Sequence, residues 1–159
     1  MIIRRATETD APAICAISNA LIAKSLITFT TTPREDAATR AQIADADGAF
    51  LVAEEGGRVL GFASFGPFRP GPGYAHTKEH SIQLTETTRG RGIGTALMGQ
   101  LEQHAREKGV HVLVAGISSA NPGAVAFHQS LGFTQTGLMP DVGRKFDQWL
   151  DLILMQKIL

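Results

Sequence analysis

The sequence has a single cysteine, Cys15, among its 159 residues. One cysteine excludes an internal disulfide framework, and no histidine stands at zinc-ligand spacing from it, so we expect no metal. No apolar run reaches the roughly 18 residues of a membrane-spanning helix. The first ten residues carry charges where a signal peptide has its apolar region. We therefore expect a cytoplasmic protein with no membrane partner.

The sequence also lacks an excess of charge of either sign, with 15 Lys and Arg against 15 Asp and Glu, and it has one tryptophan and one tyrosine. Nucleic-acid-binding proteins usually have a basic surface and aromatic side chains that stack on bases. A nucleic-acid partner is therefore the weakest alternative. The length fits one domain over residues 1–159, because a chain of this size buries about 68–70% of its unfolded surface.

The hydrophobic pattern predicts alternating strands and helices. Cys15 falls in the first helix, where we expect it to be buried. Three prolines and three glycines between Gly66 and Gly73 predict an irregular segment that borders a site. Strands are expected at 1–6, 50–53, 59–63, 81–84, 110–117, 133–138 and 149–155, and helices from an N-cap at Thr9, from a capping box at Thr32 to about Asp45, from Ile93 to a stop at Gly109, and from Asn121 to about Leu131.

The most informative segment is the glycine-rich sequence from Arg89 to Thr95, RGRGIGT, between a strand and a long helix. Glycines let backbone amides approach a ligand closely, and a helix N-terminus adds free N–H groups and the positive end of a dipole. We expect a phosphate or pyrophosphate site. The spacing fits neither a dinucleotide fingerprint nor a P-loop. The alternative is a plain strand-to-helix turn with solvated arginines.

The residues Arg89, Gly92 and Gly94 match the pattern Q/R-x-x-G-x-G/A, and here the sequence resembles the GNAT N-acetyltransferase superfamily. A second match is Asn121, followed by FHQSLGF at 127–133. The resemblance implies an α/β (α+β) fold in one domain, with a mixed, mostly antiparallel central sheet flanked by helices. It is closer to the phosphinothricin and methionine sulfoximine acetyltransferase branch, in pieces that include Thr28-Phe29, Pro33, Phe68-Arg69, Tyr74, 77–82 and 142–151.

The resemblance implies that acetyl-CoA binds between the strand at 81–85 and the strand at 110–117. Backbone groups of the first strand would pair with the pantetheine arm, and amides of the glycine-rich segment would hold the pyrophosphate. Asn121 would contact the pantetheine arm, or cap the helix ahead of Pro122, or both. The cofactor residues implied are Ile82, Gln83, Leu84, Arg89, Gly90, Arg91, Gly92, Ile93, Gly94, Thr95, Asn121 and Ser130.

The implied chemistry is direct attack of an amine on the thioester, which needs a base, an oxyanion donor and an acid for the departing sulfur. Glu79 is the candidate base, and its alternative role is a solvated carboxylate at a strand end. His128 is the candidate acid, because a histidine can carry a proton near neutral pH. Its alternative is a histidine packed on a helix face. His80 points to the other side of the strand and is a weaker candidate.

An amino-acid substrate needs a cation for its carboxylate, and the resemblance implies a floor formed by Arg69, Pro72, Gly73 and Tyr74. Phe29 would form a wall and Lys145 would supply a second cation, although Gly143 to Phe146 could be an ordinary turn. A homodimer is expected, with the site near the subunit boundary. The leading function is acetylation of a small amino-acid α-amine of the methionine sulfoximine, methionine sulfone or phosphinothricin type. The alternatives are a protein N-terminal or other amine acetyltransferase, which the insert at 66–74 argues against, and a non-catalytic acetyl-CoA-binding sensor.

Overall fold

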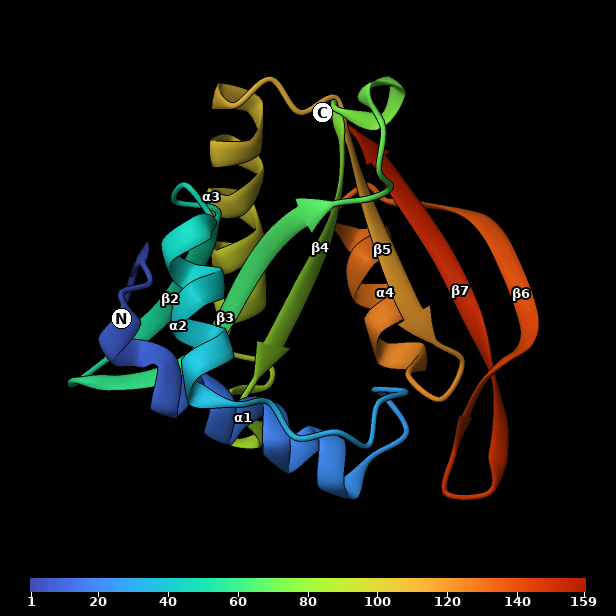
Figure 1. Cartoon of the computed structure of the whole chain (residues 1–159), viewed down its shortest axis with the longest axis horizontal. Helices are drawn as coiled ribbons and strands as arrows, with labels where there is room; N and C mark the ends of the chain where they lie inside the picture. Colours follow the sequence, from blue (N-terminus) through green and yellow to red (C-terminus); the bar gives the residue numbers. More distant parts are fainter.

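The computed structural model describes all of residues 1–159, and one seven-stranded sheet runs through it in the order β1-β2-β3-β4-β5-β7-β6 (Figure 1). All neighbouring strands are antiparallel except β4 and β5, which are parallel. The expected mixed, mostly antiparallel sheet is therefore confirmed. The strands are β1 (Ile2–Arg5), β2 (Phe50–Glu55), β3 (Arg58–Pro67), β4 (Thr77–Leu84), β5 (Val112–Ser118), β6 (Thr134–Lys145) and β7 (Gln148–Ile158).

Helices cover both faces of the sheet, with α1 (Ala11–Lys24) and α2 (Asp36–Asp45) on one face and α3 (Ile93–Glu107) and α4 (Pro122–Ser130) on the other (Figure 1). Alternate residues of β2 pack into two hydrophobic cores, one on each face of the sheet, because successive side chains of a strand point to opposite faces. Phe50 and Val52 pack with α1 and α2, whereas Leu51 and Ala53 pack with α3. No helix is long and apolar enough to cross a membrane.

The first helical turn begins earlier than predicted, at Glu8, in a short 3₁₀ turn that leads into α1. Thr7 and not Thr9 starts it, because the backbone N–H and the hydroxyl of Thr7 both donate to Asp10 Oδ2, at 2.8 and 3.2 Å. Cys15 is buried in α1 beside the hydroxyl of Thr39, as expected.

The second helix begins at Asp36, so the predicted start at the Thr32 capping box is wrong. Asn19 in α1 explains the difference. Its Oδ1 accepts from the backbone N–H of Arg34 at 2.7 Å, and its Nδ2 donates to the carbonyl of the same residue at 3.0 Å. These two bonds engage both backbone groups of Arg34, so its carbonyl is not available for a helical hydrogen bond, and α2 starts after it.

Two predicted irregular segments are more regular than expected. Gly66 and Pro67 belong to the end of β3, opposite Glu79 and Lys78, and Pro72–Tyr74 forms a 3₁₀ turn. The strands β6 and β7 are longer than predicted and form an extended hairpin, so Gly143 to Lys145 are strand residues. The tight turn lies at Phe146 and Asp147, which both have positive φ.

The strands β4 and β5 separate soon after they meet. They pair only from Thr77 opposite Val112 to Glu79 opposite Val114, and beyond this point β5 pairs with β7 alone. Figure 1 shows β4 and β5 diverging like the arms of a V, with α4 behind the opening. The edge of β4 from His80 to Leu84 therefore has no strand partner, and its backbone groups are free to bind something else.

Candidate active site

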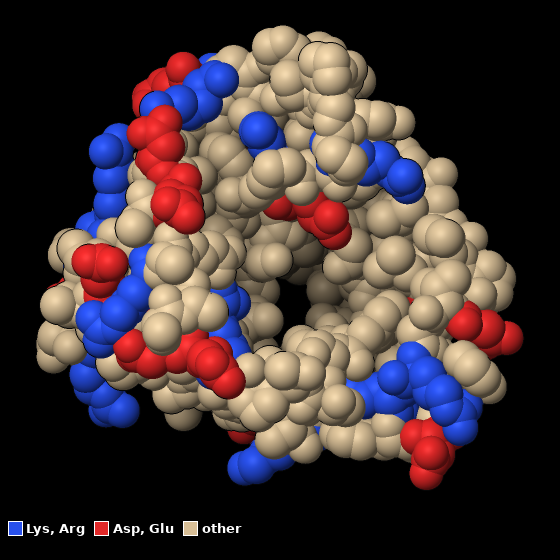
Figure 2. All heavy atoms as spheres, viewed as in Figure 1, with Lys and Arg blue, Asp and Glu red and all other residues tan.

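A cavity of about 740 Å³ lies where β4 and β5 diverge. Its wall comes from the second half of β4, from β5, from the N-termini of α3 and α4 and from the segment after α1. Arg89 is the only Lys, Arg, Asp or Glu side chain in this wall. Figure 2 shows an opening in the middle of this face that passes through to the other side, with an acidic side chain at its upper rim and most other charged side chains on the outer surface. The cavity fits a ligand with apolar and amide groups and few charges.

One end of the cavity is formed by the N-terminus of α3. Gly92 takes the N-cap position with φ 75°, and no side chain caps the helix, so amides of the first turn stay free. A Cβ on Gly90 or Gly92 would meet nothing within 4 Å, which leaves open space in front of these amides. Arg89 lines the same end. This open, positive helix terminus suits a phosphate group.

Unlike Gly90 and Gly92, Gly94 is needed for packing. A Cβ on Gly94 would lie 3.1 Å from the ring of Phe127, so this glycine allows α3 and α4 to approach each other closely. Together, the free edge of β4 and the free amides of α3 fit the pantetheine arm and the pyrophosphate of acetyl-CoA.

Most of the predicted cofactor residues meet in this cavity. Asn121 lines it and also accepts from the backbone N–H of Ala124 at 3.2 Å, so it caps α4 from the cavity wall. Arg91 lies outside, where its guanidinium pairs with Glu55 at 2.8 Å, and Ser130 is exposed with its hydroxyl on the carbonyl of Phe127. The predicted residues that do line the cavity are Ile82, Gln83, Leu84, Arg89, Gly90, Gly92, Ile93, Gly94, Thr95 and Asn121.

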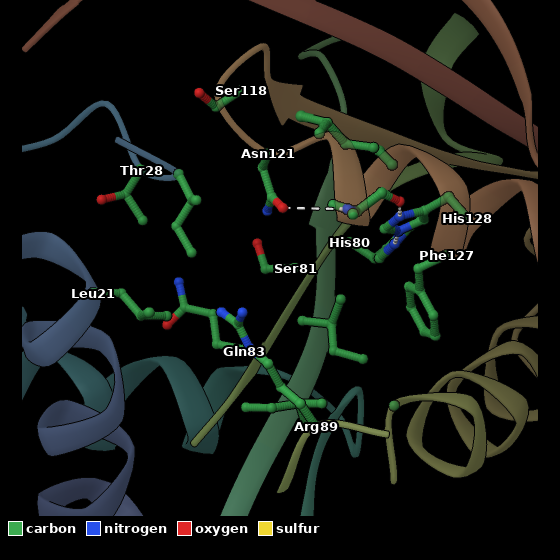
Figure 3. Close-up of a pocket in the computed structure, with 18 of the residues that line it drawn as sticks. Leu21, Thr28, His80, Ser81, Gln83, Arg89, Ser118, Asn121, Phe127 and His128 are labelled. Atoms are coloured by element: carbon green, nitrogen blue, oxygen red, sulfur yellow. Dashed lines mark hydrogen bonds between the residues drawn. The ribbon is translucent and has the colours of Figure 1, made fainter. Parts of the chain in front are cut away.

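His128 lies in the cavity wall and is paired with His80, the weaker candidate. The two Nε2 atoms are 2.9 Å apart, and His128 Nδ1 lies 2.8 Å from the carbonyl oxygen of Ala124 (Figure 3). Both rings are buried, and Phe133 packs against both. Burial lowers the pKa of His128. Burial and the neighbouring His128 lower the pKa of His80 to about 3. Both rings are therefore neutral at pH 7.

Glu79 stands at the rim of the cavity, one residue before the free edge of β4 begins. The residue as a whole is exposed, but its carboxylate lies over Gly116 of the cavity wall, where a Cβ would be 3.1 Å from Oε1. Desolvation raises the pKa of Glu79, and no cation opposes this. A carboxylate with a raised pKa suits proton transfer near neutral pH better than an ordinary one.

The segment after α1 forms one side of the cavity wall. It contains Phe29, one of the predicted substrate residues, and it contacts Lys145, another of them. Phe29 lines the cavity and packs on Gly143, where a Cβ would lie 2.6 Å from the ring. Lys145 lies behind the wall, buried, with its Nζ donating to Thr28 Oγ1 at 2.9 Å. Burial lowers the pKa of Lys145, and no carboxylate pairs with it.

Arg69, Pro72, Gly73 and Tyr74 do not reach the cavity. They are exposed, and the Arg69 guanidinium lies 5.3 Å from the ring centre of Phe68. Their segment leads into the N-terminal end of β4, where β4 and β5 are still paired, whereas the cavity opens at the other end of the strand (Figure 1). The structure of one chain therefore does not bring this segment to the cavity, and its role in substrate binding stays a prediction.

Sequence reasoning missed three polar side chains of the site. Ser81 and Thr28 line the cavity, and Ser18 of α1 donates to Gln83 Oε1 at 2.6 Å. Alternation along β4 could have found Ser81, because it shares a face with Glu79 and with the side chain of Gln83. No local signal points to Ser18, since its partner is 65 residues away in the sequence.

Residues 19–133 match the model of the Acetyltransferase (GNAT) family. The chain is 42% identical to an L-methionine sulfoximine/L-methionine sulfone acetyltransferase of Pseudomonas paraeruginosa, over 97% of this chain and 92% of that protein. Among solved structures, it is similar to a ribosomal-protein-alanine N-acetyltransferase of Brucella melitensis, with 42% identity, a TM-score of 0.94 and 100% of both chains covered. A phosphinothricin acetyltransferase of Sinorhizobium meliloti in complex with acetyl-CoA gives 33% identity and a TM-score of 0.93, with 99% of this chain and 88% of that one covered.

The family model spans both halves of the cavity wall, and the solved relatives cover the whole sheet. The free amides of α3 and the free edge of β4 give the fold its physical reason to bind acetyl-CoA. The chain belongs to the acetyltransferase (GNAT) family and is an N-acetyltransferase that takes its acetyl group from acetyl-CoA.

Proposed function

We propose that the acceptor is the α-amine of a small amino acid of the methionine sulfoximine, methionine sulfone or phosphinothricin type. The observation that carries this is the segment Ile27–Phe29, which lies in the cavity wall between α1 and β5 and is held by side chains of β5 and β6. A cavity narrowed in this way admits a small molecule more readily than a peptide chain.

Three contacts hold this segment in place. Ser118 Oγ of β5 donates to the carbonyl of Leu26 at 2.6 Å, Lys145 donates to Thr28, and Phe29 packs on Gly143. The relatives named for methionine sulfoximine, methionine sulfone and phosphinothricin support the same class of substrate.

We propose the following roles for the residues that bind the two substrates. The amides at the start of α3, with Arg89, hold the pyrophosphate of acetyl-CoA, and the free backbone of 82–84 pairs with the pantetheine arm. Asn121 orients that arm from the start of α4. Arg91 and Ser130 take no part, because their polar groups are engaged elsewhere. Thr28 donates its hydroxyl hydrogen to the acceptor's carboxylate, since its oxygen already accepts from Lys145.

Acetyl-CoA supplies a thioester carbonyl that an uncharged amine can attack directly. Glu79, at the rim where β4 loses its partner strand, takes the proton that the amine must lose, directly or through water. His128 lies beside the same end, but its Nδ1 is bonded to the carbonyl of Ala124 and its Nε2 to His80, so the departing thiolate takes its proton from the protonated Glu79 or from water. Glu79 suits both transfers because burial raises its pKa.

The test is release of free thiol from acetyl-CoA with methionine sulfoximine, methionine sulfone, phosphinothricin and a peptide with an N-terminal alanine as acceptors. We expect turnover with the three amino acids and little with the peptide. Turnover with the peptide alone would overturn the proposal.

A second candidate is acetylation of a protein N-terminus, which the likeness to the Brucella melitensis ribosomal-protein-alanine N-acetyltransferase favours. That reaction requires the Ile27–Phe29 segment to open. The peptide in the same assay distinguishes the two candidates. If Phe29→Ala, which removes the ring from Gly143, increased turnover of the peptide, the segment would be the element that excludes it.

We also propose that the protein is a cytoplasmic homodimer that associates through exposed apolar side chains of the β6–β7 hairpin. The hairpin extends away from the body of the molecule (Figure 1), and Trp149 at its end is 60% exposed. Exposed apolar surface often marks an interface. Light scattering should give the mass of two chains, and Trp149→Lys should give one. The other exposed large apolar residues of the hairpin are Leu138, Met139, Val142, Phe146 and Ile158.

A further inference from the structure

We infer that the side-chain amide of Gln83 recognises the acceptor by donating a hydrogen bond to an oxygen on the acceptor's side chain. This assignment rests on the proposed function, because it concerns the amino acid that occupies the same cavity. It adds a role for Gln83 that differs from the backbone contact expected with acetyl-CoA.

The orientation of the Gln83 amide is set by Ser18. Ser18 as a residue is 1% exposed, and its hydroxyl makes a single hydrogen bond, to Gln83 Oε1 at 2.6 Å. A buried hydroxyl needs an acceptor for its hydrogen, and of the two amide atoms only Oε1 can accept. Oε1 therefore faces α1, and Nε2 faces the other way.

The Nε2 group of Gln83 has no partner in the protein and is not sealed from the cavity. Gln83 lines the cavity, and the only buried side-chain nitrogen or oxygen without a hydrogen bond is His80 Nδ1. Figure 3 shows the Gln83 amide between Leu21 and Ser81, with its nitrogen pointing into the open space below Thr28. Two N–H groups are thus directed at a ligand.

The position of Gln83 on β4 indicates which part of the acceptor it meets. Glu79, Ser81 and Gln83 share the face of β4 that packs toward α1, whereas Ile82 and Leu84 pack with the core beneath α3. The proposed base, Glu79, draws the amine to the end of the cavity where β4 and β5 are still paired. Gln83 lies four residues beyond Glu79, a step of about 13 Å along the strand.

When the amine is at Glu79, the α-carboxylate of the same molecule cannot reach Gln83, because the carboxylate carbon is only two bonds from the nitrogen. Methionine sulfoximine, methionine sulfone and phosphinothricin each carry an oxygen five bonds from that nitrogen, on sulfur or phosphorus. These S=O and P–O oxygens are strong hydrogen-bond acceptors. The ligand class for Gln83 is therefore an amino acid with a tetrahedral oxo group at the end of its side chain.

The experiment compares kcat/KM for methionine sulfone with kcat/KM for norleucine, which has the same amine and carboxylate but no side-chain oxygen. Gln83→Met keeps the length of the side chain and removes the donor. We expect it to lower kcat/KM for methionine sulfone on the order of 10-fold and to leave norleucine within about 2-fold. The KM for acetyl-CoA should not change, because the backbone of β4 is untouched.

Two further variants test whether Ser18 orients the Gln83 amide and whether a Gln-to-Met exchange by itself damages the enzyme. Ser18→Ala frees the amide to rotate, so it should lower kcat/KM for methionine sulfone by a smaller factor, about 3-fold, and again spare norleucine. Gln103→Met makes the same exchange on the exposed face of α3, where Gln103 bonds only to Glu107, and should change neither substrate.

Three results would overturn the assignment. If Gln83→Met lowered kcat/KM equally for both amino acids, Gln83 would contact the part that they share or would only support the fold. If it changed neither, the amide would not touch the acceptor. If the wild-type enzyme acetylated neither methionine sulfone nor norleucine, the proposed function would fail first, and the role of Gln83 with it.

Discussion

The Nε2 atom of His80 lies 2.9 Å from the Nε2 atom of His128, and this pair fixes where the protons of both rings are. His128 Nδ1 is 2.8 Å from the carbonyl oxygen of Ala124, which can only accept, so Nδ1 carries the hydrogen. A neutral His128 then has a lone pair on Nε2. The hydrogen between the rings belongs to His80, whose Nδ1 is left without a partner.

The first prediction is that both rings stay neutral with these tautomers through the pH range of activity. Burial lowers the pKa of both histidines, so protonation requires a pH below the ordinary range of histidine. Long-range ¹⁵N–¹H spectra of labelled protein between pH 5 and pH 8 should give hydrogen on Nδ1 of His128 and on Nε2 of His80. A hydrogen on both nitrogens of His128 at pH 7 would contradict this arrangement.

Replacement of His128 tests whether the pair serves the reaction or only packs. His128→Phe keeps an aromatic ring against Phe133 and removes both nitrogens. Because both ring nitrogens are hydrogen-bonded within the protein, we expect kcat to fall by no more than about 10-fold, with the KM for acetyl-CoA nearly unchanged. His111→Phe, at an exposed position, is the matched control. A fall on the order of 100-fold, the usual size of a proton-transfer contribution, would instead mean that the histidine pair passes a proton to the departing sulfur.

Glu79 should give the enzyme a pH dependence that an ordinary carboxylate would not. The unprotonated form is the base, and burial raises its pKa, so kcat should fall as the pH drops through a value above the usual 4.5 of glutamate. Glu79→Gln should lower kcat at least about 100-fold and abolish this acid limb. Glu86→Gln, an exposed residue of the next turn, should keep both. An acid limb that persists in Glu79→Gln would assign the base to another group.

The parts of the site that depend on local sequence could be predicted. The glycine-rich segment before α3 presents its own backbone amides, so its residues alone indicate the site. The helix after it has a clear apolar period, and the expected helix from Ile93 to the stop at Gly109 is confirmed. Asn121 is similar, because a cap and the proline after it are neighbours in the chain.

The parts that depend on distant contacts could not be predicted. His80 meets His128 across 48 residues, and its position on the strand indicated only a face, not a partner. The start of α2 was misplaced because Asn19, in another helix, takes the backbone groups of Arg34. The position of Arg69 away from the cavity of its own chain is a further case, since the sequence does not show at which end of β4 the sheet opens.

Asp10 should contribute stability that depends on pH. The Arg4 guanidinium donates to both of its oxygens at 2.8 Å and holds the pKa of Asp10 below its usual range. Its contribution is therefore complete above the pKa of an unfolded aspartate and is lost as the pH falls through the lower, folded value. Asp10→Asn should reduce the free energy of unfolding by about 2 kcal/mol at pH 7 in urea titrations.

At pH 2 the difference between wild type and Asp10→Asn should shrink, because the carboxyl of the unfolded wild-type chain is then protonated and the charge of folded Asp10 contributes less to the free energy of unfolding. Asp36→Asn is the control, since Asp36 makes an exposed pair with Arg40 within one helix and should change stability by about 0.5 kcal/mol or less. If the free energy of unfolding of Asp10→Asn differed from that of wild type by the same amount at both pH values, the shape of the side chain and not its charge would explain the loss of stability.

Two glycines of α3 allow cofactor binding to be separated from backbone strain. Gly92 and Gly109 stand at opposite ends of the helix, each with φ 75°, and a Cβ on either would meet nothing within 4 Å. Valine at either position therefore costs a similar amount of stability, about 1–2 kcal/mol. Only Gly92→Val also places a side chain in front of the amides that face the cavity, so it should weaken acetyl-CoA binding by calorimetry about 10-fold or more. Equal affinity in the two variants would mean that the pyrophosphate does not lie at the N-terminus of α3.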